Sequence, residues 1–279
     1  MKRSRSFGGI LSGILSLAMA VDAALGAPRH RNQTEAERQE EIELLKELDN
    51  PFSKLIRINI RNDWDFGVGL AKAMRYTATL NPVIPFSLND EWSLFVRMTV
   101  PMVYAEPALP GMRAKTGLGN IGQTFYLSPK KTTERWIWGV GPSFLYPSAS
   151  EHGLGAEKWA AGPSLAVLQQ RNRWTYGVLV NHLWSFAGES SGKAMNATSA
   201  VGFVSHITKR LTSFQVSTGS VYDWRTGQQT VPVEISTTQI LKAGKQDMSI
   251  SLGGRYYAEK AAGGPDWSLN FTVALLFPK

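Results

Sequence analysis

The feature that most constrains this chain is a period of two in its apolar residues, which runs from about Ser53 to the end of the sequence. The clearest case is "WSLNFTVALLF" at 267–277, where aromatic and aliphatic residues alternate with Ser, Asn, Thr and Ala. "LIRINIR" and "EWSLFVRMTV" alternate in the same way. Because successive side chains of a strand point to opposite faces, this pattern predicts strands with one apolar and one polar face.

Segments of this kind follow one another along the chain, separated by polar turns such as "SLNDE" and "KAGKQD". Many are longer than the roughly five or six residues usual in soluble sheets, and they match the about nine to eleven residues that cross a bilayer at a tilt. We expect about twelve strands, at residues 54–66, 74–88, 91–104, 116–128, 135–147, 158–169, 173–186, 196–207, 211–222, 229–241, 247–258 and 266–277.

Aromatic residues gather near the ends of these segments, as they do in the two interfacial girdles of a membrane barrel. No segment beyond the N-terminus is apolar enough for a membrane helix, and a sheet in lipid must close because an open edge would leave backbone groups unpaired. The pattern therefore predicts an all-β fold, a closed antiparallel transmembrane β-barrel of about twelve strands with a short N-terminal helix. A soluble sandwich with alternating strands is the competing interpretation.

The first 27 residues resemble a secretory signal peptide, with Lys2, Arg3 and Arg5 ahead of an apolar run. We expect cleavage after Ala20 or Ala23, and a signal anchor is the alternative. An exported barrel would lie in the cell outer membrane.

Residues 28–50 form a polar segment in which Ile42, Leu45 and Leu48 recur at helical spacing. This predicts a short periplasmic amphipathic helix that ends at Pro51. A solvated linker helix is the simpler interpretation, although the helix could also sit in the pore as a plug. The barrel would then occupy residues 51–279.

The composition excludes several classes of site. The chain has no cysteine, which rules out disulfides, thiolate metal sites and catalytic thiols. Its 4 histidines are scattered, so we expect no metal and no cofactor. The formal net charge is +8, but no run of Lys and Arg of the nucleic-acid type is present, and we expect no nucleic-acid partner.

The stretch "GLGNIG" at 117–122 fits the dinucleotide-binding pattern G-x-G-x-x-G. The glycines of that motif work where a strand turns into a helix that holds a pyrophosphate. Here "QTFYLSPKK" follows, which alternates and then turns. We therefore assign the stretch to the fourth strand, where small residues leave room in the lumen beside Asn120.

Several segments carry a resemblance to a known family: "NPVIPFSLNDEWSLFVRMTVP", "GLGNIGQTFYLSPKK", "WIWGVGPSFLYPSAS", "KWAAGPSLAVL", "RWTYGVLVNHLWSFAG", "YDWRTGQQTVPVEIS" and "GPDWSLNFTVALLFPK". They resemble Gram-negative outer-membrane proteins that are labelled transporters and related to the phenol meta-pathway outer-membrane group. The resemblance covers roughly Asn50 to Lys279. It implies an outer-membrane β-barrel and a channel for small organic compounds, with aromatic compounds as candidates. The segment 196–208 departs from the family pattern, which leaves its register undecided.

Alternation places a set of polar residues on the inward, water-facing side of the barrel, where they would line a pore. A ring of guanidinium groups would favour anions and could stack on aromatic solutes. Alternatively, the arginines form a satisfied ion-pair lattice with Glu234, and this lattice closes the lumen to most solutes. The predicted pore-lining residues are Arg57, Asn59, Arg61, Arg97, Asn120, Glu234, Arg255 and Asn270.

These patterns predict a channel for passive or weakly selective passage of small organic solutes, with aromatic or anionic compounds as candidates. A structural envelope barrel without flux is one alternative. A lipid-modifying enzyme is another, with His182 beside Ser185 or Ser190 as its candidate residues. We expect no catalytic residue. The expected partners are outer-membrane lipid and lipopolysaccharide, the barrel-assembly machinery during insertion and a small-molecule solute, and we expect a monomer.

Overall fold

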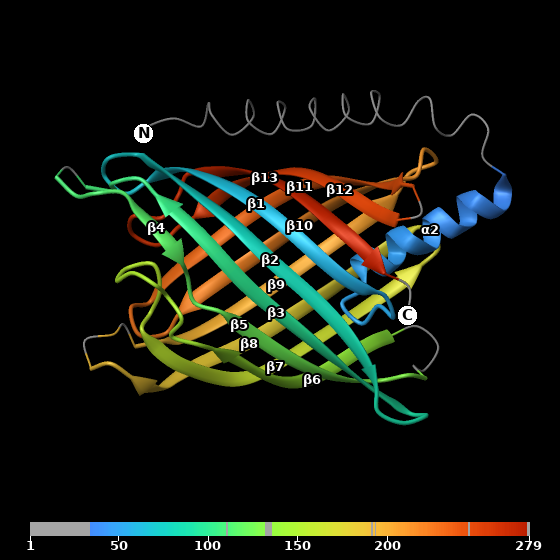
Figure 1. The fold of residues 1–279 in the computed structure, drawn as a ribbon, viewed down its shortest axis with the longest axis horizontal. Helices are drawn as coiled ribbons and strands as arrows, with labels where there is room; N and C mark the ends of the chain where they lie inside the picture. Colours follow the sequence, from blue (N-terminus) through green and yellow to red (C-terminus); the bar gives the residue numbers. More distant parts are fainter. Residues whose placement is uncertain are drawn as a thin grey trace.

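The computed structural model describes residues 34–109, 111–131, 136–190, 192, 194–244 and 246–277. Its described part is a closed antiparallel β-barrel with one helix at one end (Figure 1). The predicted signal peptide, residues 1–27, lies outside the described residues. The described helix is not long and apolar enough to span a membrane.

The helix is α2 (Glu35–Asp49), and the strands follow it in chain order around the barrel. They are β1 (Ile56–Val68), β2 (Ala73–Ser87), β3 (Trp92–Ala105), β4 (Lys115–Leu118), β5 (Gly122–Pro129), β6 (Trp136–Leu145), β7 (Lys158–Arg171), β8 (Trp174–Gly188), β9 (Asn196–Ile207), β10 (Thr212–Asp223), β11 (Gln228–Ala243), β12 (Gln246–Glu259) and β13 (Trp267–Phe277).

Pairing of β1 with both β2 and β13 closes the barrel. Both β4 and β5 pair with β3, β4 with residues 102–105 and β5 with residues 92–99. They are therefore two parts of one barrel strand, and the thirteen described segments make twelve barrel strands. This confirms the predicted fold class.

The break between β4 and β5 falls inside "GLGNIG". There the backbone N–H of Gly119 donates to the carbonyl of Pro101 at 2.8 Å. The N–H groups of Leu118 and Ile121 donate to the hydroxyls of Ser150 and Ser148 at 2.9 and 2.7 Å. The stretch is thus part of the barrel wall, held by the loop 146–157, and a strand follows it where a dinucleotide site would need a helix.

The two ends of the barrel differ. At one end the connections are short, as in the two-residue turn 172–173 between β7 and β8, and α2 enters there (Figure 1). We call it the helix end. At the other end, the loop end, longer connections such as 106–114 and 146–157 lie between the strands. The segment 196–208, whose register the sequence left undecided, forms β9 and pairs along its length with β8 and β10.

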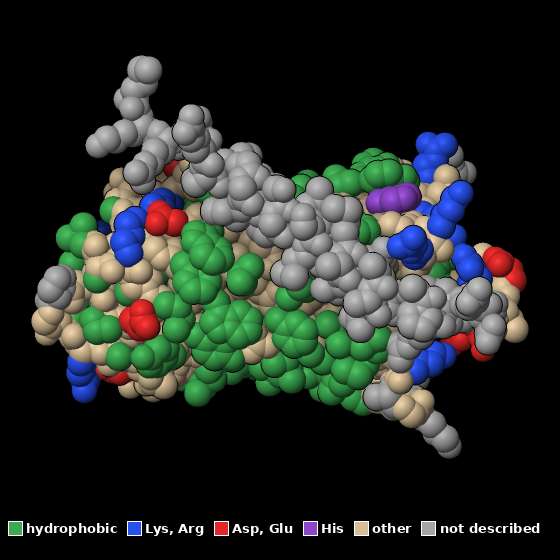
Figure 2. Space-filling view, turned by 90° about the horizontal axis from the view of Figure 1, so that it is seen from above, with side chains coloured by type: hydrophobic (Ala, Val, Ile, Leu, Met, Phe, Trp, Pro, Cys, Tyr) green, Lys and Arg blue, Asp and Glu red, His purple; other side chains and the backbone are tan. Residues whose placement is uncertain are grey.

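The two faces of the sheet carry opposite chemistry. Figure 2 shows an apolar band over the middle of the outer surface, with charged side chains toward both ends. Exposed apolar residues such as Val178, Val204 and Val216 belong to this outer face, whereas Ser164, Ser205 and Ser236 are buried on the inner one. A soluble sandwich has an apolar core, so this arrangement argues against that alternative.

A Gly-Pro pair interrupts the wall on two neighbouring strands. Pro142 of β6 lies opposite Pro163 of β7, and the ladders from these strands to β5 and β8 are interrupted beside them. The preceding glycines lie against the neighbouring backbone. A Cβ added at Gly141 would meet the carbonyl oxygen of Phe125 at 1.8 Å, and one at Gly162 would meet that of His182 at 1.7 Å.

We therefore predict that Gly162→Ala destabilises the folded barrel by about 1–3 kcal/mol, the usual cost of overpacking. The measurement is the fraction of barrel that shows heat-modifiable gel migration after refolding across a urea series. Gly202→Ala is the matched control, since its Cβ would meet no atom closer than 3.7 Å. Equal stability of the two variants would contradict the prediction.

Candidate functional site

The helix α2 begins with a capping box. The Thr34 hydroxyl accepts a hydrogen bond from the backbone N–H of Glu37, and the Glu37 carboxylate accepts one from that of Thr34. These bonds satisfy backbone donors that a helix start leaves free. The acidic residues of the first turn also interact favourably with the helix dipole. The first turn of the helix is therefore stabilised by residues of its own sequence.

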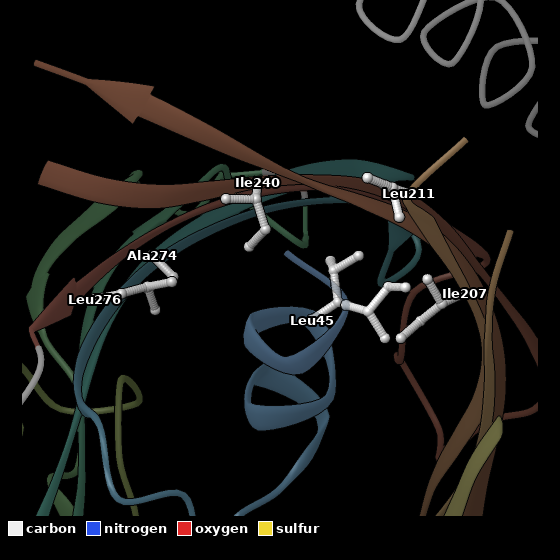
Figure 3. Close-up of a cluster of buried hydrophobic side chains, with 7 residues drawn as sticks. Leu45, Ile207, Leu211, Ile240, Ala274 and Leu276 are labelled. Atoms are coloured by element: carbon white, nitrogen blue, oxygen red, sulfur yellow. The ribbon is translucent and has the colours of Figure 1, made fainter. Parts of the chain in front are cut away.

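The second half of α2 lies inside the helix end of the barrel, where Ile42 and Leu45 are buried. Figure 3 shows Leu45 projecting from the helix toward the inner wall. The wall residues of this cluster are Ile207, Leu211, Ile240, Ala274 and Leu276. The linker interpretation is thus wrong for this half of the helix, although the residues of its first turn are largely exposed.

A second apolar cluster holds the chain just after the helix. Phe52 makes edge-on contacts with Phe95 and Tyr126, with ring centroids 5.4 and 5.5 Å apart. The opposite wall has room for this ring because residue 139 is glycine, where a Cβ would lie 2.6 Å from the Phe52 ring. The helix is therefore followed by an aromatic anchor that fits a recess in β6.

Arg57 joins the end of the helix to the wall. Its Nη1 donates to the carbonyls of Glu47 and Leu48 at 3.1 and 2.6 Å, and its Nη2 donates to that of Asn50 at 2.9 Å. The last carbonyls of a helix lack the i+4 donors of its interior, and a cation at this end is favoured by the helix dipole. Ser205 donates a 2.5 Å bond to the Asp49 carboxylate nearby. Arg57, predicted as pore-lining, thus anchors the plug.

Beyond the plug, arginines and acids of the inner face form a compact lattice. Glu234 of β11 accepts from Arg61 at 2.9 Å and from Arg255 at 2.7 Å. Asp63 pairs with the same two arginines at 2.8 and 3.4 Å. For Arg61 and Arg255 the geometry therefore matches the ion-pair lattice rather than a ring of free guanidinium groups.

Sequence reasoning missed three members of this lattice. Arg75 pairs with Asp65 at 2.6 Å, and Asp63 joins the two arginines described above. The signal was present, because Asp63 and Asp65 continue the inward parity of Arg57, Asn59 and Arg61 along β1. Their arginine partners on other strands, Arg75 and Arg255, come from β2 and β12, which the strand pattern alone could not specify.

Arg97 differs from the other inward arginines. It lies on the inner face of β3, opposite Val83 and Thr124, and it is exposed to the lumen. Within the described part of the chain, no side chain or carbonyl forms a hydrogen bond or ion pair with its guanidinium group. It is a free inward cation in this part of the structure.

Two cavities of the lumen lie beside the plug and the lattice. The larger is about 530 Å³ and is lined by Asn59, Arg61, Arg97, Glu234 and Arg255 among others. The smaller is about 250 Å³ and lies against the end of the helix. Both are lined by Leu48, Asp49, Asn59, Arg97, Val201 and Gln215. The plug and the lattice therefore narrow the lumen without filling it.

Two predicted residues lie elsewhere. Asn120 lies at the break between β4 and β5, where a Cβ on Gly155 of the loop 146–157 would touch its side chain. Asn270 is buried beside Gly253. Neither lines the two lumen cavities. The part that the six other residues play in passage stays a prediction.

The geometry gives little support to a lipid-modifying enzyme or to a metal site. His182 faces outward from β8, with its Nδ1 2.7 Å from the Thr198 hydroxyl and its ring against Trp184. Ser185 is bonded to the backbone of Met195 instead. No group of three or more potential metal-ligating His, Cys, Asp or Glu residues exists among the described residues.

No family model matches the sequence, and no curated protein matches it significantly. Among solved structures, an outer membrane channel from Pseudomonas putida F1 is similar, with a TM-score of 0.65, 14% identity, and coverage of 80% of this chain and 96% of that chain. The NanC porin has a TM-score of 0.50, 11% identity, and coverage of 79% and 98%. At such identities, these likenesses show a shared barrel fold.

The central place of Glu234 in the lattice leads to a stability prediction. Glu234→Gln should destabilise the barrel by roughly 2 kcal/mol, because two guanidinium groups lose their shared carboxylate. This is less than the cost for a fully buried pair, because the two arginines are partly exposed. Urea unfolding followed by tryptophan fluorescence measures this change. Glu259→Gln, the same change at the exposed end of β12, should have little effect. A similar loss in both variants would contradict the role of the lattice.

Docking of the helix should depend on pH through Asp49. Burial raises the pKa of this carboxyl from 3.8 to about 6, despite the Ser205 hydrogen bond and the charge of Arg57. The docked helix then holds a proton that the released helix gives up, so docking is strongest below about pH 4 and weakens up to about pH 6.

A fluorophore on Glu35→Cys, in a chain with no other cysteine, reports release as a fall in anisotropy. Release should increase between pH 4 and pH 6.5 in the otherwise unaltered chain. Asp49→Asn should remove this dependence while keeping the helix docked at pH 7. A pH profile that the substitution leaves unchanged would assign the effect to another group.

Proposed function

We propose that this chain is an outer-membrane channel for passive or weakly selective passage of small organic solutes, with aromatic and anionic compounds as candidates. The observation that carries the proposal is a closed barrel with an apolar outer face and a polar lumen that still holds a cavity of about 530 Å³. An apolar outer band is stable in lipid, and a polar lumen is stable when it holds water.

The ends of the barrel support an orientation. Bacterial outer-membrane barrels have short periplasmic turns and longer outer loops. By this criterion the helix end faces the periplasm, so α2 would narrow the pore from the periplasmic side. The predicted signal peptide, which precedes the helix, agrees with export. Outer-membrane lipid and lipopolysaccharide around the apolar band, insertion by the barrel-assembly machinery and a monomeric state are parts of the same proposal.

The similar structures support the channel over the other classes. Two solved structures that share the fold are described as an outer membrane channel and a porin. The relation to the phenol meta-pathway group rests on the sequence segments that resemble that family. It suggests aromatic solutes and is a proposal about this chain.

A structural barrel without flux is the second candidate, and the ion-pair lattice and docked helix favour it. Conductance in planar bilayers separates the two functions. The full chain should conduct, and deletion of residues 28–50 should raise its conductance because the plug is gone. Absence of conductance in both forms would contradict the channel proposal.

The guanidinium group of Arg97 in the lumen, which is unpaired among the described residues, predicts a preference for anions over cations. Arg97→Glu should shift the reversal potential in a salt gradient toward cation preference, because it reverses the charge beside both cavities. Arg171→Glu is the matched control, since it makes the same change at an exposed position where β7 meets its turn. An unchanged reversal potential in Arg97→Glu would show that ions do not pass this residue.

A further inference from the structure

We propose that the smaller lumen cavity is a binding site for a small monoanion with an apolar body, such as an aromatic monocarboxylate. Arg97 binds the carboxylate, and the apolar wall beside the end of α2 holds the rest of the molecule. This inference rests on the proposed channel function and names the class of solute that the cavity beside the helix binds.

The arginines of the inner face differ in whether they have partners. Arg61 and Arg255 share two carboxylates, and Arg75 pairs with Asp65. Arg57 is fixed to three backbone carbonyls at the end of the helix. Arg97 has no such partner within the described residues, although its guanidinium group offers five donors. It is the arginine whose donors are free for a ligand.

The charges around the smaller cavity are suited to a monoanion. Its lining holds two cations, Arg57 and Arg97, and one acid, Asp49. With Asp49 ionised, the lining carries a net charge of +1, which a monoanion neutralises. The Asp49 carboxylate is already bonded to Ser205 and belongs to the helix, so it does not neutralise Arg97 through a direct ion pair. A dianion would meet this carboxylate and be disfavoured.

The rest of the wall of the smaller cavity is suited to an apolar ring. It is apolar and partly aromatic, and the amide side chains of Asn59 and Gln215 lie among its lining. The cavity measures about 250 Å³, smaller than the roughly 300–1,000 Å³ of pockets for drug-sized ligands. A single ring with one carboxylate suits this size. The apolar lining residues that belong to the barrel strands are Val83, Phe95, Tyr126, Leu179, Val201 and Phe203.

A guanidinium group recognises a carboxylate through two parallel hydrogen bonds, which is a geometry that a lysine cannot reproduce. Apolar contact then adds affinity in proportion to the surface removed from water. The site should therefore need both parts of the ligand. A neutral ring lacks the charge, and a short acid lacks the apolar body.

Calorimetric titration of the purified full-length barrel in detergent tests this, with benzoate, benzyl alcohol and acetate as probes. Benzoate should bind at least about tenfold more tightly than either of the others, as expected for one hydrogen-bonded charge or one buried ring. Equal binding of acetate would overturn the apolar part of the site. Binding of benzyl alcohol as tight as that of benzoate would overturn the proposed role of Arg97 in binding the carboxylate.

Variants then assign the site. Arg97→Gln should weaken benzoate binding about tenfold or more, and Arg97→Lys should restore only part of it. Arg171→Gln, at the end of β7, should bind like the unaltered protein. Heat-modifiable migration checks that each variant is folded. A folded Arg97→Gln barrel that binds benzoate normally would overturn the proposal.

The bilayer recordings keep this result separate from the proposed function. A barrel that conducts ions and does not bind benzoate would overturn the binding site and leave the channel function in place. A barrel that binds benzoate through Arg97 and conducts nothing would overturn the channel function and support the site.

Discussion

The rest of this structure depends on the backbone pairing that joins β1 to β13. Once the first and last strands pair, the described sheet closes on itself, and one of its faces surrounds a lumen. The alternation of apolar and polar residues then separates two environments, an apolar outer band and a polar interior. A sheet with this pattern could not be stable in lipid if it stayed open, because its edge groups would lack partners. Closure is therefore the condition for the lumen and for everything placed in it.

Within the lumen, the decisive property is which charges have partners. The acids Asp63, Asp65 and Glu234 neutralise three arginines toward the loop end, and helix carbonyls hold Arg57 at the helix end. Between these groups Arg97 keeps a free guanidinium group beside two cavities. The part of the lumen that stays free is thus set by a few side chains and by the position of α2.

The helix shows how local and distant interactions combine. Its capping box and its apolar spacing form the helix locally, whereas its position depends on Leu45, Phe52 and Arg57 meeting three different parts of the wall. The small size of Gly139 and the bond from Ser205 to Asp49 complete this fit. A helix docked by so few groups can respond to the protonation of one of them.

The sequence by itself determined the strands, their facing and the helix, because alternation, turn residues and helical spacing are local properties. It placed the eight predicted lumen residues on one parity, and six of them line the cavities. Only the tertiary structure decided which charges meet, since Arg61 and Glu234 lie 173 residues apart. It also decided that Arg57 holds the plug, that the fourth strand breaks at the glycine-rich stretch and leaves Asn120 against a loop, and that Arg97 has no partner among the described residues. Partners across a barrel are fixed by closure and register, and no single strand carries that information.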